Sequence, residues 1–179
     1  MGLDMLLEAR HYLLDSADKE RVGTLFNNGF RAKSVVFEIK YWRKANAIHK
    51  WFVENVQEGE DDCREAYVSI EKLKELRELC NRILESTTLK KAKVENGYNF
   101  DMAGNKVSYM EDGKALKDST LAEELLPTTE GFFFGGTDYD EWYWMNLLET
   151  RDALDELFAR MEREPDKWKS ISFYYSSSW

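Results

Sequence analysis

The chain is poor in the residue types and patterns that usually reveal a protein's chemistry. Its 179 residues include only two cysteines, two histidines and two prolines. Neither Cys63 nor Cys80 has a CxxC partner, and two cysteines are too few for a disulfide framework. No P-loop, dinucleotide fingerprint, GxSxG elbow, HExxH pair or EF-hand spacing occurs. We therefore expect no cofactor, no metal and no catalytic residue, and the sequence disfavours an enzyme.

Long apolar runs and an excess of basic residues are also missing. No stretch approaches the roughly 20 apolar residues that span a bilayer, and the N-terminus does not read as a signal peptide. We expect no membrane contact and a cytoplasmic location. The formal net charge of −9 opposes the phosphate backbone of nucleic acids, so direct nucleic-acid binding is not expected. An acidic surface instead suits a basic surface of another protein.

What is present is the composition of a globular protein. Hydrophobic residues make up 43% of the chain and charged residues 33%, and no Gly/Ser/Pro-rich linker divides it. We expect one domain over residues 1–179. Residues 86–120 are less hydrophobic and are a candidate surface insertion, with a hairpin that turns at 103–105.

Alternation of apolar and polar residues predicts strands at both ends of the chain. Residues 3–10 and 168–179 follow this pattern, and so do residues 35–42. In the last of these, Val35, Phe37, Ile39 and Tyr41 are expected to share one face. The apolar run 132–134 predicts a short buried strand. Residues 15–33 are polar and predict a loop.

Helical periodicity predicts three main helices. The first begins near Arg43 and ends near Gly59, and the second is capped by Ser69 and runs to about Glu85. A capping box of Thr137 and Asp140 is expected to open the third, which Pro165 closes. A short helical turn is expected at 121–126.

These elements predict an α+β fold. An antiparallel or mixed sheet that includes the N- and C-terminal strands is expected to pack with about three helices. The C-terminal strand is expected to dock beside the strand at 35–42.

The first candidate binding segment is the junction between that strand and the first helix. It combines cations with aromatic planes, which suit a phosphate or carboxylate and a stacked base: Trp42, Arg43, Lys44, His49 and Trp51. The alternative is a solvated basic face over an aromatic core. His49 borders the apolar stripe of its helix, so a hydrogen-bonded structural histidine is favoured over a general base.

The second candidate segment is the start of the third helix. Asp138, Asp140 and Glu141 crowd one turn beside Tyr139, after the pair Gly135 and Gly136. Three carboxylates there suit a cation or a basic partner, whereas the alternative is simple stabilisation of the helix dipole.

The third candidate segment is the aromatic C-terminus, which ends at Trp179. The aromatic residues around 139–144 and 173–179 are more than one helical stripe and one strand face can bury. Exposed tyrosine and tryptophan dominate binding hot spots. A common exposed patch built from all three segments is the premise of the binding hypothesis.

Several of these segments also carry a family resemblance. The chain opens with MGLDM and continues with YWRKANAIHKWF at 41–52, DDC at 61–63, GFFFGGTDYDEWY at 131–143 and FYYSSSW at 173–179. Together they resemble a family of small phage- and prophage-encoded proteins. The resemblance implies a role in infection, action in the host cytoplasm, and inhibition of host defence as the leading expectation.

The expected partner is a host or phage protein, or a small nucleotide such as a defence messenger. Self-association is a further expectation. Two other functions remain open: a metal-dependent nucleotide or phosphoester hydrolase that uses the acidic cluster with His49, and a structural or assembly protein.

Overall fold

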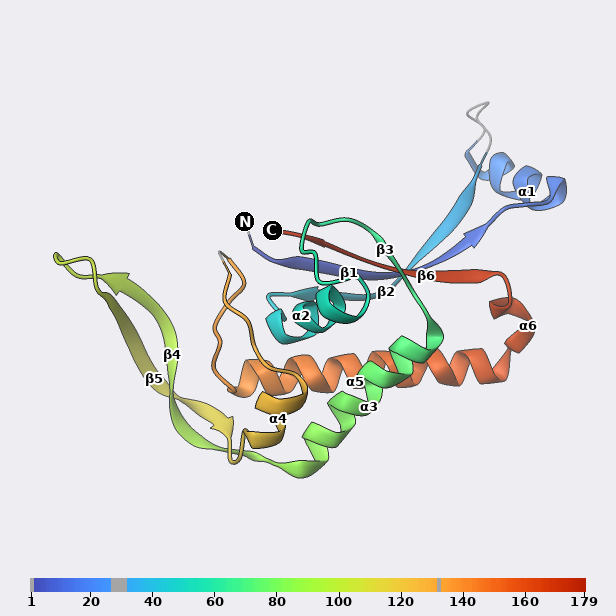
Figure 1. Cartoon of the computed structure of the whole chain (residues 1–179). Helices are drawn as coiled ribbons and strands as arrows, with labels where there is room; N and C mark the ends of the chain where they lie inside the picture. Colours follow the sequence, from blue (N-terminus) through green and yellow to red (C-terminus); the bar gives the residue numbers. More distant parts are fainter. Residues whose placement is uncertain (1, 27–31, 132) are drawn as a thin grey trace.

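The structure is a computed structural model that describes residues 2–26, 32–131 and 133–179. It confirms the α+β class, with antiparallel sheets and with both terminal strands in the larger sheet (Figure 1). That sheet has four strands in the order β2-β1-β6-β3, namely β2 (Ser34–Arg43), β1 (Asp4–Tyr12), β6 (Ile171–Ser178) and β3 (Ala66–Val68).

The C-terminal strand β6 lies beside β1 and β3, so the predicted pairing with β2 is wrong. Met5, Leu7 and Ala9 of β1 are fully buried. Such a strand is best accommodated in the middle of the sheet, where both of its edges are hydrogen-bonded. Alternation reports which face of a strand is buried and carries no information on its neighbour.

A β-bulge changes the buried face of β2. Leu7 pairs with Lys40 while Glu8 pairs with Glu38, so one residue of β2 is unpaired between them. Beyond the bulge Trp42 is 3% exposed and Tyr41 is 42% exposed. The predicted strand is confirmed, but the prediction that Tyr41 shares a face with the residues at 35–39 is wrong, because the extra residue reverses the alternation.

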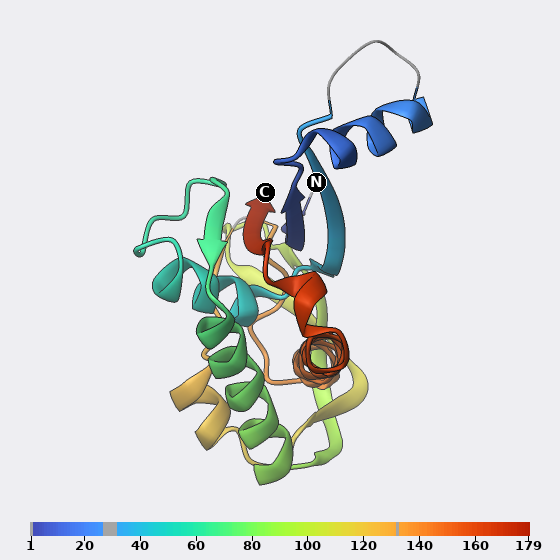
Figure 2. The same cartoon turned by 90° about the vertical axis from the view of Figure 1, so that its right-hand side faces the viewer.

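Three helices cover one face of this sheet: α2 (Asn46–Asn55), α3 (Ile70–Ser86) and α5 (Glu141–Arg163) (Figures 1 and 2). The predicted stripe of α3 is confirmed, because all of its members are buried: Leu73, Leu76, Cys80, Ile83 and Leu84. Tyr143, Leu147, Leu154 and Leu157 of α5 are buried as well. The core therefore lies between the sheet and these helices.

Two capping predictions had different outcomes. The Ser69 side chain accepts a hydrogen bond from the amide of Lys72, which confirms Ser69 as the N-cap of α3. The cap of α5 is Asp140, which accepts from the amide of Tyr143 at 3.0 Å, and not Thr137. Aspartate and threonine are both common N-cap residues, so the sequence alone does not decide whether α5 begins after Thr137 or after Asp140.

Two local predictions are wrong. Within the segment predicted as a loop, the structure has α1 (Ser16–Phe26), where the amide of Asp18 donates to Asp15 Oδ1 at 2.7 Å. Its described side chains are exposed or half-buried, so no strong apolar stripe marks it. Residues 27–31 lie outside the described part. The expected strand at 132–134 is also not found for its described residues, because Phe133 has φ +73°.

Residues 88–117 form a hairpin arm. Its strands are β4 (Leu89–Phe100) and β5 (Lys106–Leu116), and they pair antiparallel along their length. Asp101 Oδ1 accepts from the amides of Ala103 and Asn105, which confirms the predicted turn. Figure 1 shows the arm projecting away from the rest of the molecule. Two short helices complete the fold: α4 (Thr120–Leu125), which matches the predicted turn, and α6 (Pro165–Trp168).

Candidate functional site

Several segments that lie far apart in the sequence meet around Phe134. Asn46 at the start of α2 donates from its amide nitrogen to the carbonyl of Gly136 at 2.7 Å and to that of Phe134 at 3.3 Å. In return its side-chain oxygen accepts from the amide of Thr129 at 3.2 Å. The loop before α5 is thereby tied to the strand–helix junction, 83 to 90 residues away in sequence.

His49 is the centre of a hydrogen-bond chain beside this contact. Its Nε2 lies 3.0 Å from Asp61 Oδ2, and its Nδ1 lies 2.7 Å from the hydroxyl of Tyr175. Asp61 Oδ1 also accepts from the indole nitrogen of Trp179 at 3.0 Å. The ring of Phe134 stands edge-on to His49, with centroids 5.1 Å apart, and lies 5.8 Å from that of Trp179.

The inner end of this chain is sealed from solvent. His49 and Tyr175 are both 0% exposed, and the Tyr175 ring stacks on Phe52 with a centroid distance of 3.9 Å. Burial raises the pKa of the Tyr175 hydroxyl well above its usual value. A general base needs a substrate within hydrogen-bond reach, and here both ring nitrogens of His49 are already occupied. The arrangement therefore acts as a latch that joins α2, the loop at residue 61 and the C-terminal strand.

The tryptophans of the basic junction belong to the core. Trp42 is 3% exposed and donates from its indole to Thr150 Oγ1 at 2.8 Å, and Trp51 is 5% exposed. Neither presents a ring face on which a base could stack. Arg43 and Lys44 are exposed. The cations of this segment therefore lie at the surface, whereas its two tryptophan rings are buried.

The acids at the start of α5 each have a local contact. Asp140 caps the helix, and burial raises its pKa. Glu141 is ion-paired with Lys114 of the arm at 2.6 Å, and Asp138 lies 3.5 Å from the amide of Glu95. Tyr139 is half-buried against Tyr143. Among the described residues no group of three His, Cys, Asp or Glu side chains is placed to hold a metal ion.

The predicted common patch is therefore only partly formed. Trp179, which is 49% exposed, shares its surroundings with Asp61 and His49. The acids at the start of α5 are instead engaged with the arm. The three predicted segments thus contribute to two separate places in the molecule.

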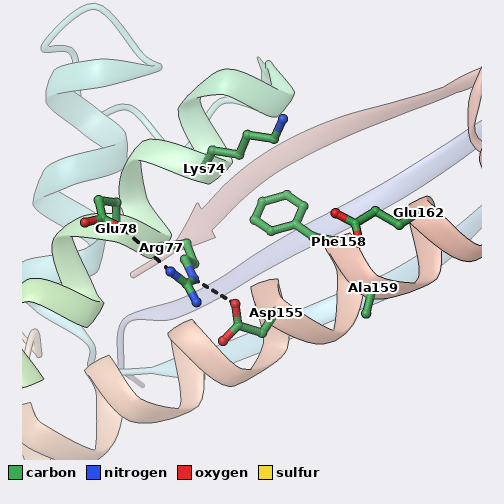
Figure 3. A pocket seen from close by; sticks show the side chains of 7 residues that line it. All are labelled: Lys74, Arg77, Glu78, Asp155, Phe158, Ala159 and Glu162. Atoms are coloured by element: carbon green, nitrogen blue, oxygen red, sulfur yellow. Dashed lines mark hydrogen bonds and ion pairs between the residues drawn. The ribbon is translucent and has the colours of Figure 1, made fainter.

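An open groove of about 540 Å³ lies between α3 and α5. Figure 3 shows Arg77 between Asp155 and Glu78 at its floor, with Arg77 Nε 2.7 Å from Asp155 Oδ1. Arg77 thus pairs with both neighbouring acids, and none of the residues that line the groove is a buried polar residue. Its lining is Lys74, Arg77, Glu78, Asp155, Phe158, Ala159 and Glu162.

A different surface, the face of the sheet away from the helices, carries a cluster of aromatic and charged side chains. We call it the tyrosine face. Because side chains alternate along a strand, the residues between the buried Met5, Leu7 and Ala9 point to this side. Its members are Asp4, Leu6, Glu8, Arg10, Tyr12, Tyr41, Tyr67 and Tyr174. Figures 1 and 2 show that α2, α3 and α5 lie on the opposite side of the sheet.

The tyrosine face is held in a defined arrangement. Arg10 lies 4.5 Å above the Tyr174 ring and donates from Nη1 to Glu65 Oε1 at 2.9 Å, which raises the pKa of Arg10. The hydroxyls of Tyr12 and Tyr174 are 3.1 Å apart, and Tyr67 meets Tyr174 edge to face. The three outer tyrosines remain accessible, with exposed fractions of 40% for Tyr12, 42% for Tyr41 and 61% for Tyr67.

Sequence reasoning missed most of this surface. The alternation in residues 3–10 and 168–179 identified the buried side of each strand. The signal that would have found the opposite side is tyrosine at polar positions of the two terminal strands, at 12 and 174. Tyr41 could not have been added, because it reaches this side only through the bulge in β2. Asp61 and Tyr175 were likewise missed as partners of His49.

Comparisons with family models, with curated proteins and with solved structures found no match for this chain. None of the helices in the described part of the chain combines the length and apolar character needed to cross a membrane.

Proposed function

We propose that this protein acts by binding another protein through the tyrosine face, without catalysis. The observation that carries the proposal is the set of three accessible tyrosines, Tyr12, Tyr41 and Tyr67, on the sheet face opposite to α2, α3 and α5. Tyrosine supplies a large contact area at low conformational-entropy cost and is enriched in binding hot spots.

The fixed geometry of this face supports the same proposal. Tyr174 is held by Arg10, by the Tyr12 hydroxyl and by the edge of the Tyr67 ring. Side chains that are already ordered lose little entropy when a partner binds, so more of the contact energy appears as affinity.

Charge favours a basic partner. The sheet face and its borders carry the carboxylates of Asp4, Glu8, Glu38 and Glu65, against the cations of Arg10 and Arg43. The whole chain has a net charge of −9. Complementary charge raises the rate of encounter with a basic protein surface and disfavours nucleic acid. The resemblance to phage-encoded proteins makes a host protein, such as a defence component, the partner that we propose.

The other functions have less support. A nucleotide-binding site would need a stacking platform, and Trp42 and Trp51 are buried. A metal-dependent hydrolase would need Asp138, Asp140 and Glu141 to converge, whereas each of them is engaged elsewhere. A role as a structural or assembly protein is consistent with the exposed tyrosine face.

The test compares three tagged proteins expressed in the host: the natural chain, a Tyr67→Ser/Tyr174→Ser variant, and the control Trp142→Ser. Trp142 is 76% exposed on α5, away from the tyrosine face, so the control removes an exposed ring elsewhere. Co-purifying proteins and small molecules are identified by mass spectrometry, and the affinity of the recovered protein is then measured. We expect the double variant to bind about 30-fold or more weakly, as loss of one hot spot of about 2 kcal/mol implies.

The control should bind the partner as tightly as the natural chain does. Higher salt should weaken partner binding by both the control and the natural chain. Equal binding by the double variant, with its fold confirmed by thermal melting, would show that the tyrosine face is not the binding surface. Recovery of a stoichiometric small molecule instead of a protein would favour the nucleotide hypothesis.

A further inference from the structure

The hairpin arm exposes more apolar surface than a solvated hairpin needs. Six large side chains of residues 98–110 have exposed fractions between 47% and 108%: Tyr98, Phe100, Met102, Val107, Tyr109 and Met110. A two-stranded hairpin alone in water is marginally stable and usually needs a further layer packed on it. A cluster of this kind marks an interaction site.

Both faces of the arm carry apolar side chains. Tyr98 pairs with Ser108 and Glu95 with Met110, which places Tyr98 and Met110 on one face. Val107 and Tyr109 alternate with these positions and lie on the other face. The arm therefore exposes apolar side chains on both of its faces, unlike a hairpin that packs one face on a core and leaves the other polar.

The arm joins the body at its base. Lys114 pairs with Glu141, Ala115 bridges to Asp140, and the amide of Leu116 donates to the carbonyl of Tyr139 at 2.8 Å. From there the arm extends outward, away from the sheet and helices (Figure 1). Its apolar tip therefore lies away from the core of the molecule.

The arm also differs from the body in charge. Residues 88–117 hold six lysines and four carboxylates, for a net charge of +2, within a chain of net charge −9. The remaining residues therefore carry −11. Lys91 and Lys93 are exposed on the arm, while the tyrosine face is bordered by carboxylates such as Glu8 and Glu38.

We propose that, in the free protein, the arm of one copy docks on the tyrosine face of a second copy. The chain then carries both halves of one contact: an aromatic element of net positive charge, and an aromatic face of net negative charge. Aromatic pairs contribute beyond their buried area, and opposite charges set the orientation. This inference deepens the proposed function, on which it rests, because the arm would occupy the face that the partner protein must reach.

The expected size of the contact suits a reversible dimer. If two copies exchange arms, the dimer contains two arm–face contacts, so each contact needs to bury about 400 Å² of the arm and about 400 Å² of the face to reach a standard interface. An aromatic side chain has on the order of 150–250 Å² to bury, and a little over half of Tyr98, Phe100 and Tyr109 is still exposed, so these rings with their aliphatic neighbours are sufficient. Exchange by both copies closes the assembly as a dimer, whereas a one-way contact would build chains.

The experiment measures the mass of the purified protein by light scattering and sedimentation equilibrium. In one variant, Asn-Gly replaces residues 94–111, which keeps the Lys93–Asp112 pair as the last rung of the hairpin. In the second variant, Tyr67→Ser/Tyr174→Ser alters the face and keeps the arm. A point variant of the arm, Phe100→Ser/Tyr109→Ser, provides a check that does not alter the backbone.

We expect the natural chain to be a dimer that dissociates at high salt, and each variant alone to be a monomer. An equimolar mixture of the shortened-arm and altered-face variants should form a one-to-one heterodimer, because one intact arm meets one intact face. Leu14, which is 82% exposed and lies on neither surface, provides the control: Leu14→Ser should remain dimeric.

Three results would overturn the inference: a monomeric natural chain, a shortened-arm protein that still dimerises, or a mixture that stays monomeric. Dimerisation of the altered-face variant alone would point to arm–arm pairing instead. The proposed function is tested separately, because the monomeric shortened-arm protein keeps an intact tyrosine face. It should capture the partner protein at least as well as the natural chain, whatever the outcome of the mixing experiment.

Discussion

Tyr175 donates its hydroxyl proton to Nδ1 of His49 across 2.7 Å, although 126 residues separate the two in sequence. The direction of this hydrogen bond follows from the other ring nitrogen. Nε2 faces the carboxylate of Asp61, which only accepts, so Nε2 carries the proton and Nδ1 is the acceptor. This contact joins α2 to the C-terminal strand, and Asp61 and Trp179 extend it to the surface.

Substitution of His49 should therefore test the latch. His49→Leu leaves the buried hydroxyl of Tyr175 without an acceptor, and we expect the free energy of unfolding to fall by about 2–4 kcal/mol. Tyr175→Phe alone should cost about 1–2 kcal/mol. In the double variant both partners are apolar, so its loss should be smaller than the sum of the two single losses. Urea unfolding of the four proteins gives the coupling energy, and strictly additive losses would contradict the hydrogen bond.

The start of α5 gives a second prediction. Asp140→Ala removes the side chain that accepts from the Tyr143 amide, and should destabilise the protein by about 0.5–2 kcal/mol. Thr137→Ala is the matched control, because Thr137 does not cap the helix, and it should change stability by less than about 0.5 kcal/mol. Thermal or urea unfolding measures the stability of both variants. A larger loss of stability in Thr137→Ala would show that Thr137, and not Asp140, caps the helix.

A third prediction uses two neighbouring glycines. Gly135 has φ +93°, and a Cβ added there would lie 3.1 Å from Cβ of Lys44. Gly135→Ala should destabilise the protein by about 1–2 kcal/mol through backbone strain and crowding. At Gly136 a Cβ meets open space, so Gly136→Ala should be nearly neutral. Similar unfolding midpoints for the two variants would show that the loop relaxes freely.

Alkaline pH gives a fourth prediction. Burial raises the pKa of the Tyr143 hydroxyl, which donates to the carbonyl of Leu126 at 2.9 Å. In the unfolded chain tyrosine ionises near pH 10, so above that pH the unfolded state loses a proton that the folded state keeps. Stability should fall by up to about 1.4 kcal/mol per pH unit for this group as pH rises above 10.

Tyr143→Phe should reduce this slope, at a cost of about 1 kcal/mol at neutral pH for the lost hydrogen bond. Urea midpoints measured on both sides of pH 10 follow the effect. Tyr67→Phe is the control, because Tyr67 is 61% exposed, and it should keep the steep slope. An unchanged slope in Tyr143→Phe would mean that other buried groups, such as Tyr175 and Cys80, account for the alkaline loss.

Local patterns explain which parts of the fold were predictable. The cap at Ser69 and the stripe of α3 are contained within one element, and both are confirmed. The face of Tyr41 was predicted wrongly, because the bulge opposite Leu7 and Glu8 depends on a second strand. Helix α1 was missed because its described side chains are exposed or half-buried, which leaves no marked periodicity.

In the candidate site, too, local patterns were readable from the sequence and tertiary burial was not. The aromatic and charged segments were selected for their composition, but the exposure of their side chains was not readable from spacing. Trp42 and Trp51 lie in the core, whereas Tyr41 and Tyr67 lie at the surface.

By itself, the sequence determined the α+β class, the buried sides of β1 and β6, and the acidic balance of the chain, because composition and periodicity act over a few neighbouring residues. Only the tertiary structure decided that β6 lies against β1, that His49 meets Asp61 and Tyr175, and that four tyrosines share one face of the sheet. These relationships join residues that lie between 12 positions (His49 and Asp61) and 174 positions (Asp4 and Ser178) apart in sequence. They depend on which strand becomes central and on how far each helix covers the sheet, and no local pattern encodes either.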